Sequence, residues 1–198
     1  MSVDDAEITD RRVLRGMRNR EALVSAVIEL IEEGELSPTA TQIADRAGVA
    51  VRSIYHHFDD LDDVSRTVAD TLLGSFIELI QPIPTDGPFD KRLRPFVSQR
   101  SQLAERAMPV HRASLLLVHS SPAVAERLAF ASEFLRAEMA QTFAIEFADA
   151  PKWTIETLDA LCSLDGWVRL RVDQRLKVGA ATKVLRGTLV ALLNDGTL

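Results

Sequence analysis

Apolar residues recur at helical spacing in every long segment of this 198-residue chain. Leu23, Val27 and Leu30, for example, follow the i, i+4, i+7 spacing that places side chains on one face of a helix. No stretch of useful length shows the alternation of apolar and polar residues that is typical of a strand. The sequence therefore predicts an all-α fold, in which we expect nine helices.

Glycine, proline and capping residues indicate where these helices begin and end. Gly34 is placed to end the first helix, since glycine readily adopts the left-handed conformation found at helix C-termini. Thr39 and Gln42 form a capping-box pattern at the start of a short second helix. The stretch 81–88 (QPIPTDGP) must interrupt the helical pattern. Further helices are expected at about residues 50–57, 61–81 (capped by Asp60), 89–107, 109 onward, 122–150, 154–175 and 178–193.

The composition is that of an ordinary soluble globular protein, with 46% apolar and 26% charged residues. No apolar run approaches the roughly 18–20 residues needed to span a bilayer, and the acidic N-terminus is unlike a signal peptide. A single cysteine, Cys162, cannot form an internal disulfide. We therefore expect a cytoplasmic location, no membrane partner, no metal and no cofactor.

Residues 39–58 (TATQIADRAGVAVRSIYHHF) have the spacing of a helix-turn-helix motif. The small residue Ala44 lies where two helices would cross closely, and Gly48 occupies the turn, where it accepts a positive φ without steric cost. Such a pair holds its second helix outward, in a position to enter the major groove of DNA. The residues expected to face the shared core are Ile43, Ala47, Val49 and Ile54.

The block from Arg20 to Val64 resembles the DNA-binding domain of the TetR family. The family's Ile-Ala, Gly-Val and Tyr-x-x-Phe elements stand here as Ile43-Ala44, Gly48-Val49 and Tyr55 to Phe58. The resemblance covers about the first third of the chain. It implies a DNA-binding domain at residues 16–76, and a C-terminal ligand-binding and dimerisation domain at residues 77–198.

The resemblance also implies which positions contact DNA. Arg52 is the one residue at the start of the second motif helix that could bond guanine O6 and N7 in a bidentate manner, whereas Val51 could pack on a thymine methyl group. Tyr55 and His56 resemble positions that touch the sugar–phosphate backbone. Altogether the expected DNA-contacting residues are Thr39, Thr41, Gln42, Ala50, Val51, Arg52, Ser53, Tyr55 and His56.

The adjacent histidines His56 and His57 do not predict a metal site. Neighbouring positions on a helix diverge by about 100° and do not readily chelate one ion. We interpret His56 as a donor to phosphate and His57 as packed toward the fourth helix.

Two charge features concern the strength of DNA binding. The family usually has a lysine at the start of the fourth helix, where this chain has Leu61, surrounded by Asp59, Asp60, Asp62 and Asp63. Residues 11–20 (RRVLRGMRNR) contain five arginines and no acidic residue. This stretch is either a solvated tail or an arm that binds phosphate.

The C-terminal helices carry apolar stripes. They consist of Ile155, Leu158, Leu161, Val168 and Val172 on one helix, and Val184, Leu185, Thr188, Leu189 and Leu192 on the last. Some of these residues belong to the core in any case, but two such helices resemble the family's dimer interface. A homodimer is also needed to place two recognition helices about one DNA turn apart.

A ligand pocket in the C-terminal part would be apolar with a few polar groups. His111, Arg112, His119, Phe134 and Trp167 are its expected residues, although aromatic side chains here, including Phe130 and Phe143, are more often core.

The leading hypothesis is a repressor that leaves operator DNA when an unidentified small molecule binds. The alternative is a TetR-like dimer with weak or lost operator binding that acts through protein partners, as the missing lysine suggests. An enzyme is not expected, because Cys162 and four scattered histidines form no recognisable catalytic constellation.

Overall fold

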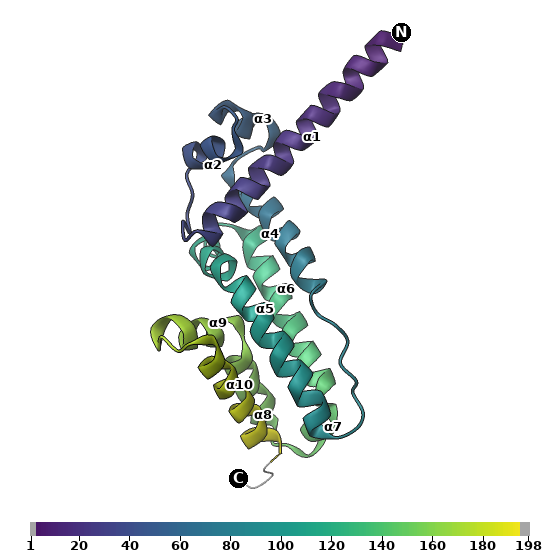
Figure 1. Cartoon of the computed structure of the whole chain (residues 1–198), viewed down its shortest axis with the longest axis vertical. Coiled ribbons are helices and arrows are strands. Elements are labelled where there is room, and N and C mark those ends of the chain that lie inside the picture. The colour runs from purple at the N-terminus through teal and green to yellow at the C-terminus, as the bar shows by residue number, and fades with distance from the viewer. Residues whose placement is uncertain (1–2, 195–198) are drawn as a thin grey trace. The chain divides into compact units, whose positions relative to one another are not determined.

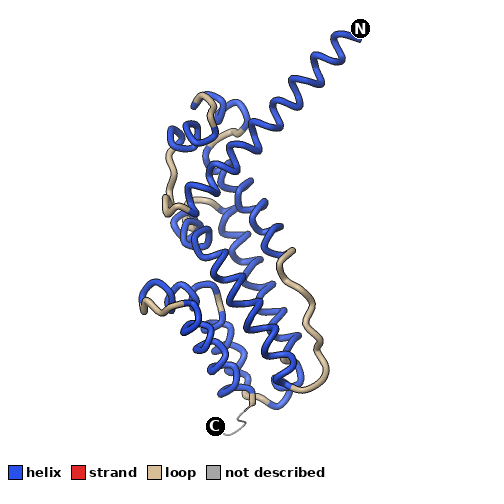
Figure 2. The backbone as a smooth tube through the Cα atoms, in the orientation of Figure 1, coloured by secondary structure: helices blue, strands red, loops and turns tan. Residues whose placement is uncertain are grey.

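Every regular element in residues 3–194 is a helix. The computed structural model describes residues 3–194, and side chains from Gly16 onward together with that of Leu14. Within this range there are ten α-helices, one 3-10 turn and one π-helical turn, joined by loops (Figures 1 and 2). This finding confirms the predicted all-α class. In the same range no helix combines the length and the apolar character needed to cross a bilayer.

The helices follow one another with short connections, apart from the loop between α4 and α5. Their bounds are α1 Val3–Glu32, α2 Ala40–Ala47, η1 Val51–Ser53, α3 Ile54–His57, α4 Leu61–Ile77, α5 Phe89–Leu117, α6 Pro122–Thr142, α7 Ala144–Asp149, α8 Lys152–Cys162, α9 Leu164–Val168, η2 Arg169–Asp173 and α10 Val178–Leu193.

The chain divides into two compact units. The first comprises the residues up to 72 together with 113–125, and the second comprises residues 73–112 and those from 126 onward. The first unit contains α1 to α3 and most of α4. Its core is formed by one face of α1, the two short helices that follow and the first half of α4. The buried residues of this core are Leu23, Val27, Leu30, Ile43, Ala44, Ile54, Phe58, Val64 and Val68.

The second unit has an apolar core that is crossed by buried arginines from α5. Phe96, Phe143 and Leu158 are completely buried in this core. Arg92 is buried and donates to the Thr142 carbonyl at 2.7 Å and to the Glu146 carboxylate. Because each buried guanidinium needs partners for its donors, these bonds fix α5 against the helices that follow it.

Helix α5 is continuous through Pro109, whereas the sequence predicted one helix ending at Ala107 and another beginning at Pro109. Proline removes only its own N–H donor and costs a helix interior about 3 kcal/mol, which packing on both sides can offset. Pro95 lies in the same helix. The prediction of a break was therefore wrong here.

Two other predicted helices are divided in the structure. The segment 122–150 breaks at Phe143, which is fully buried and separates α6 from α7. The segment 154–175 breaks at Ser163, whose hydroxyl accepts a 3.0 Å bond from the Gly166 N–H and so caps α9. Gly166 is required there, because a Cβ on it would lie 2.5 Å from the Leu161 carbonyl oxygen. The bounds predicted for α10 are confirmed.

Candidate nucleic-acid interface

Helix α2 begins with a complete capping box. The Thr39 hydroxyl accepts from the Gln42 N–H at 3.3 Å, and the Gln42 side-chain oxygen accepts from the Thr39 N–H at 2.8 Å. The helix ends at Gly48, which has a φ of +67° and donates its N–H back to the carbonyl oxygens of Ala44 and Asp45. These local bonds fix both ends of α2, as the sequence predicted.

The second motif helix consists of the 3-10 turn η1 followed by α3. Its inner side is anchored by Ile54 and Phe58, which are 0% and 3% exposed. Its outer side carries a row of exposed residues: Ala50, Val51, Arg52, Tyr55 and His56. The predicted framework is thus buried. Ala47 and Val49 are half-buried rather than fully buried.

The residues at the start of α2 that we predicted to contact DNA differ in their exposure and in their hydrogen bonds within the protein. Thr41 is exposed at the start of the helix. The Thr39 hydroxyl and the Gln42 side chain are used in the capping box, and the Gln42 amide also donates to Glu35 at 3.2 Å. Ser53, on η1, is half-buried. Thr39 and Gln42 would therefore contact an anion while they keep the hydrogen bonds that cap α2.

Helix α2 is held against α1 by Arg46. Its guanidinium lies 2.5 Å from Glu33 and 3.4 Å from Glu29. The hydrogen bond from Arg46 lowers the pKa of Glu33, and the bond to Glu33 raises the pKa of Arg46. Glu33 and Arg46 are therefore both ionised near neutral pH, and their contact orients the motif on α1.

His56 and His57 have different surroundings. His56 is exposed, and His57 is half-buried with its ring close to α1, where a Cβ added at Gly16 would lie 3.7 Å from the His57 Cε1. Burial lowers the pKa of His57, and the neighbouring His56 and Arg20 lower it further. His57 is therefore neutral at pH 7, and it packs on α1.

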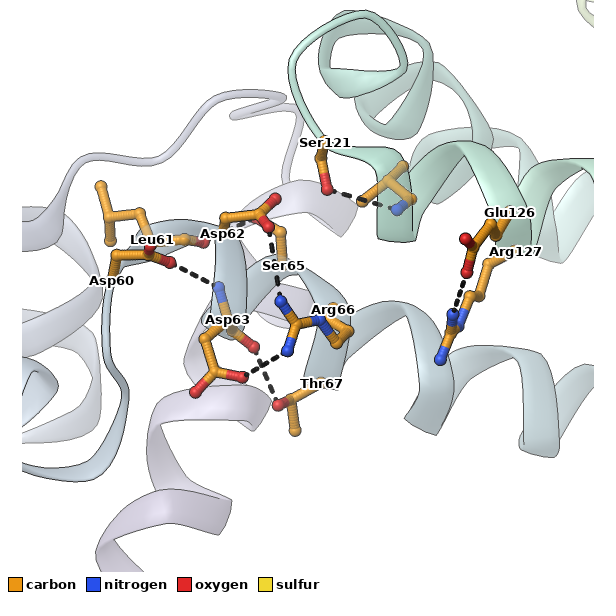
Figure 3. Close-up of polar contacts among 11 residues, drawn as sticks. Asp60, Leu61, Asp62, Asp63, Ser65, Arg66, Thr67, Ser121, Glu126 and Arg127 are labelled. Atoms are coloured by element: carbon orange, nitrogen blue, oxygen red, sulfur yellow. Dashed lines mark hydrogen bonds and ion pairs between the residues drawn. The ribbon is translucent and has the colours of Figure 1, made fainter.

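The acidic start of α4 is partly balanced within the protein, by one arginine and by a helix cap. The Asp60 carboxylate accepts from the Asp63 N–H at 2.8 Å and caps the helix, as predicted. Asp62 and Asp63 both reach Arg66, at 3.6 and 3.5 Å (Figure 3). Leu61, at the position where a lysine was expected, is 41% exposed. The carboxylates thus repel a DNA backbone less than their number suggests.

The expected pocket residues lie in different environments. His111 is buried, and its Nε2 lies 2.8 Å from Asp165 Oδ1, a partner that could not be predicted from the sequence. Trp167 is buried in the core of the second unit, and Arg112 and Phe134 are half-buried. His119 is exposed and belongs to the first unit. Phe134 stacks on Phe130, with ring centres 6.4 Å apart.

Two of these residues have a buried polar atom without a hydrogen-bond partner among the described residues. They are the Nδ1 atom of His111 and the Nε1 atom of Trp167. Such atoms are costly to bury and are usually paired. Phe143, by contrast, contacts Phe89 and Phe96 at ring distances of 5.7 and 5.0 Å and is a core residue.

The predicted apolar stripes of the last helices are partly core and partly surface. Leu158, Leu185 and Leu189 are buried, whereas Leu161 and Val184 are 50% and 43% exposed. These two exposed residues line a cavity of about 440 Å³ that also contains residues of α9 and η2. An apolar face of this kind, on two neighbouring helices, is typical of an interaction surface.

These features define an all-helical protein with a helix-turn-helix unit and a second helical unit. Residues 19–64 match the family model of the bacterial regulatory proteins of the tetR family. Over 67 residues the chain is 36% identical to the HTH-type transcriptional repressor KstR2 of Rhodococcus jostii, which is 32% of this chain and 33% of that protein. The chain thus matches about a third of the length of this curated relative. The similarity to the tetR family thus lies in the N-terminal part of the chain, at residues 19–64.

Solved structures share the fold along most of the chain. A transcriptional regulator from Rhodococcus sp. Rha1 superposes with a TM-score of 0.66 at 20% identity, covering 90% of this chain and 98% of the other. The multidrug binding protein EbrR complexed with imidazole gives a TM-score of 0.61 at 18% identity, covering 85% and 93%. At sequence identities of 20% and 18%, the similarity to these two structures shows a shared fold and nothing more.

Proposed function

We propose that this chain is a DNA-binding transcriptional regulator, a repressor that leaves its operator when a small molecule binds. The observation that carries the proposal is the contrast between the two sides of the second motif helix. Ile54 and Phe58 are buried, while Arg52 and Tyr55 are exposed. A helix anchored in this way presents its N-terminal residues to base edges in the major groove.

Each exposed residue has a proposed role. Arg52 bonds guanine, Val51 packs on a thymine methyl group, and Tyr55 and His56 contact the backbone. Thr41 and the capped N-terminus of α2 bind a phosphate, together with Thr39 and Gln42. Ala50 and Ser53 allow the close approach of the DNA. The domain limits that we propose are residues 16–76 for DNA binding and 77–198 for ligand binding and dimerisation.

A homodimer in the cytoplasm is the proposed assembly, because two recognition helices must be about one DNA turn apart to read a palindrome. We place the interface on α8 and α10, at Leu161 and Val184. Leu161→Asp should convert the dimer into monomers in sedimentation velocity. Ile145→Asp, at a residue that is 55% exposed on α7, is the matched control and should leave the dimer intact. A Leu161→Asp variant that stays dimeric contradicts this placement.

The proposed effector binds in the second unit near His111 and Trp167. The unpartnered Trp167 Nε1 is a donor, and the unpartnered His111 Nδ1 is an acceptor when Nε2–H donates to Asp165, so the two atoms support a ligand with both an acceptor and a donor. EbrR, a structural relative, is a multidrug binding protein. An effector acts only if it binds the two states of the dimer with different affinity. It should therefore quench Trp167 fluorescence in a Trp153→Phe background and weaken DNA binding at the same concentrations.

DNA selection tests the proposal directly. Full-length protein, incubated with duplexes that contain a randomised centre, should enrich a palindrome and bind it with an affinity that falls steeply with salt. The alternative function, in which a TetR-like dimer acts through protein partners, is motivated by Leu61 in place of lysine. Failure to enrich any sequence at low salt would favour that alternative. The pairing of Asp62 and Asp63 with Arg66 supports DNA binding instead.

A further inference from the structure

Helix α1 is much longer than the helix-turn-helix unit requires. It runs without interruption from Val3 to Glu32, and its N-terminal half projects beyond α2 and α3 (Figure 1). Among the described side chains of α1, burial begins near Leu23, whereas Leu14 and Met17 are 51% and 56% exposed. The backbone of the arginine-rich stretch is therefore part of one continuous helix.

Two contacts fix the direction of this helical extension beside the second motif helix. The backbone at Gly16 passes close to the ring of His57, the last residue of α3. One turn later, Arg20 lies over the Phe58 ring, 4.7 Å from its centre, and donates to the Thr67 hydroxyl at 3.0 Å. The extension thus starts next to the exposed His56 and Tyr55, which we assign to the DNA backbone.

Charge is sharply segregated along α1. Residues 11–20 contain five arginines and no acid, and residues 21–35 contain five glutamates and no basic residue. Arg20 is used in the contact with Phe58, which leaves positions 11, 12, 15 and 18. Positions 11, 15 and 18 fall on one side of a helix, because they are four and three residues apart. The basic residues of α1 therefore all lie in the segment that begins at the contact with His57 and Phe58 and runs toward the N-terminus.

We propose that residues 11–18 of α1 form a helical clamp on the phosphate backbone of the DNA that flanks each half-site. This inference rests on the proposed DNA-binding function. Arg11 lies five residues before Gly16, which is about 7.5 Å along the helix, or roughly two base pairs of DNA. Asp4, Asp5, Glu7 and Asp10 precede it and set the outer limit of the contact. The arginines of the clamp supply the positive charge for DNA binding that is missing at Leu61, where the family usually has a lysine.

The experiment uses the full-length protein and the palindromic sequence that it selects. Two duplexes are compared: one is trimmed to the palindrome, and the other is extended by six base pairs on each side. The test variant combines Arg11→Gln, Arg12→Gln, Arg15→Gln and Arg18→Gln. The control variant combines Lys91→Gln, Arg94→Gln, Arg106→Gln and Lys152→Gln, four exposed residues of the second unit with the same total charge. Affinities are measured over a range of salt concentrations.

The test variant should bind the extended duplex about tenfold more weakly than the unmodified protein, with a salt dependence lower by about five in log–log slope, because three phosphate contacts are lost from each of the two clamps of the dimer. Trimming should weaken the unmodified protein by a similar factor and leave the test variant unaffected. Equal affinity and slope for the test variant and the unmodified protein would overturn the proposal. An equal loss of affinity in the control variant would also overturn the proposal, because it would show that net charge alone causes the effect.

A second pair of variants tests the rigidity of the clamp. Leu14→Pro interrupts α1 between the outer arginines and Gly16, and Leu14→Ala keeps the helix. We expect Leu14→Pro to lose the preference for the extended duplex and Leu14→Ala to retain it; full retention by both overturns a rigid clamp.

If no palindrome is selected, the proposed operator recognition fails separately. The clamp is then tested on a 40-base-pair duplex of random sequence at low salt. Weaker binding by the test variant supports the clamp, and equal or absent binding overturns it.

Discussion

The guanidinium of Arg20 lies 4.7 Å from the centre of the Phe58 ring and donates a 3.0 Å hydrogen bond to Thr67. One side chain of α1 thereby joins the last residue of the helix-turn-helix motif and the first half of α4. Phe58 is buried beneath it. The position of the recognition helix relative to α1 depends on this contact. Nothing in the sequence distinguishes Arg20 from the other arginines around it.

Arg20→Ala should lower the free energy of unfolding by about 1 kcal/mol, because it removes a cation–π contact and a hydrogen bond from a surface site. Arg20→Lys keeps the charge but loses the planar stacking, and should have an intermediate effect. Urea unfolding followed by circular dichroism measures both. Equal stability of the three proteins would show that the stacking has no energetic role.

Thr39→Ala should destabilise the first unit by about 1 kcal/mol, since it deprives the Gln42 N–H of its cap. Thr39→Ser keeps the hydroxyl and should restore most of the loss. Amide hydrogen exchange of α2 provides the measurement, with faster exchange at its first turn expected in Thr39→Ala alone. Protection that is the same in Thr39→Ala and Thr39→Ser would contradict the capping role.

Features that depend on a few neighbouring residues could be predicted from the sequence. The Thr39–Gln42 box, the turn at Gly48, the Asp60 cap and the bounds of α10 are of this kind. Gly34 likewise has a φ of +102° just after α1. In each case the local hydrogen bonds decide the conformation.

Features decided by distant contacts could not be predicted. Helix α5 continues through Pro109, because packing along its length outweighs one missing donor. The hydrogen bond between the His111 Nε2 and the Asp165 carboxylate joins residues 54 apart in the chain. For the break between α8 and α9 there was a signal, since Ser163 and Gly166 have the spacing of a cap. The apolar stripe across that break obscured it.

Glu146→Gln should cost about 3 kcal/mol, because it leaves the buried Arg92 without its counter-charge. Arg92→Met combined with Glu146→Leu removes both charges and should cost less than the single change. Chemical unfolding of the three proteins measures the difference. A double variant that is less stable than Glu146→Gln would contradict the argument from an uncompensated buried charge.

The same pair gives stability a defined pH dependence. The hydrogen bond from Arg92 lowers the pKa of Glu146 below its ordinary value of 4.5. The stabilisation is therefore complete above about pH 4.5 and is lost as the pH falls through the lower pKa of the folded state. Glu146→Gln should unfold with a weaker dependence on pH in this acidic range.

Cys162 should be unreactive in the folded protein. Burial raises the pKa of its thiol to about 12, although the nearby Arg100 opposes this shift. The reactive thiolate is therefore negligible at pH 8. Ellman's reagent should label no thiol in the native protein and one thiol per chain in guanidinium chloride. Rapid labelling without denaturant would show that α8 opens readily.

The central claim is that the exposed side of the second motif helix reads DNA, and Arg52 tests it most directly. The measurement compares the unmodified protein with Arg52→Ala on the selected palindrome and on its single-base variants. The account predicts a loss of about 1–3 kcal/mol and a relaxed preference at one base position in each half-site. Full affinity with an unchanged base preference in Arg52→Ala would contradict the assignment of this face to DNA recognition.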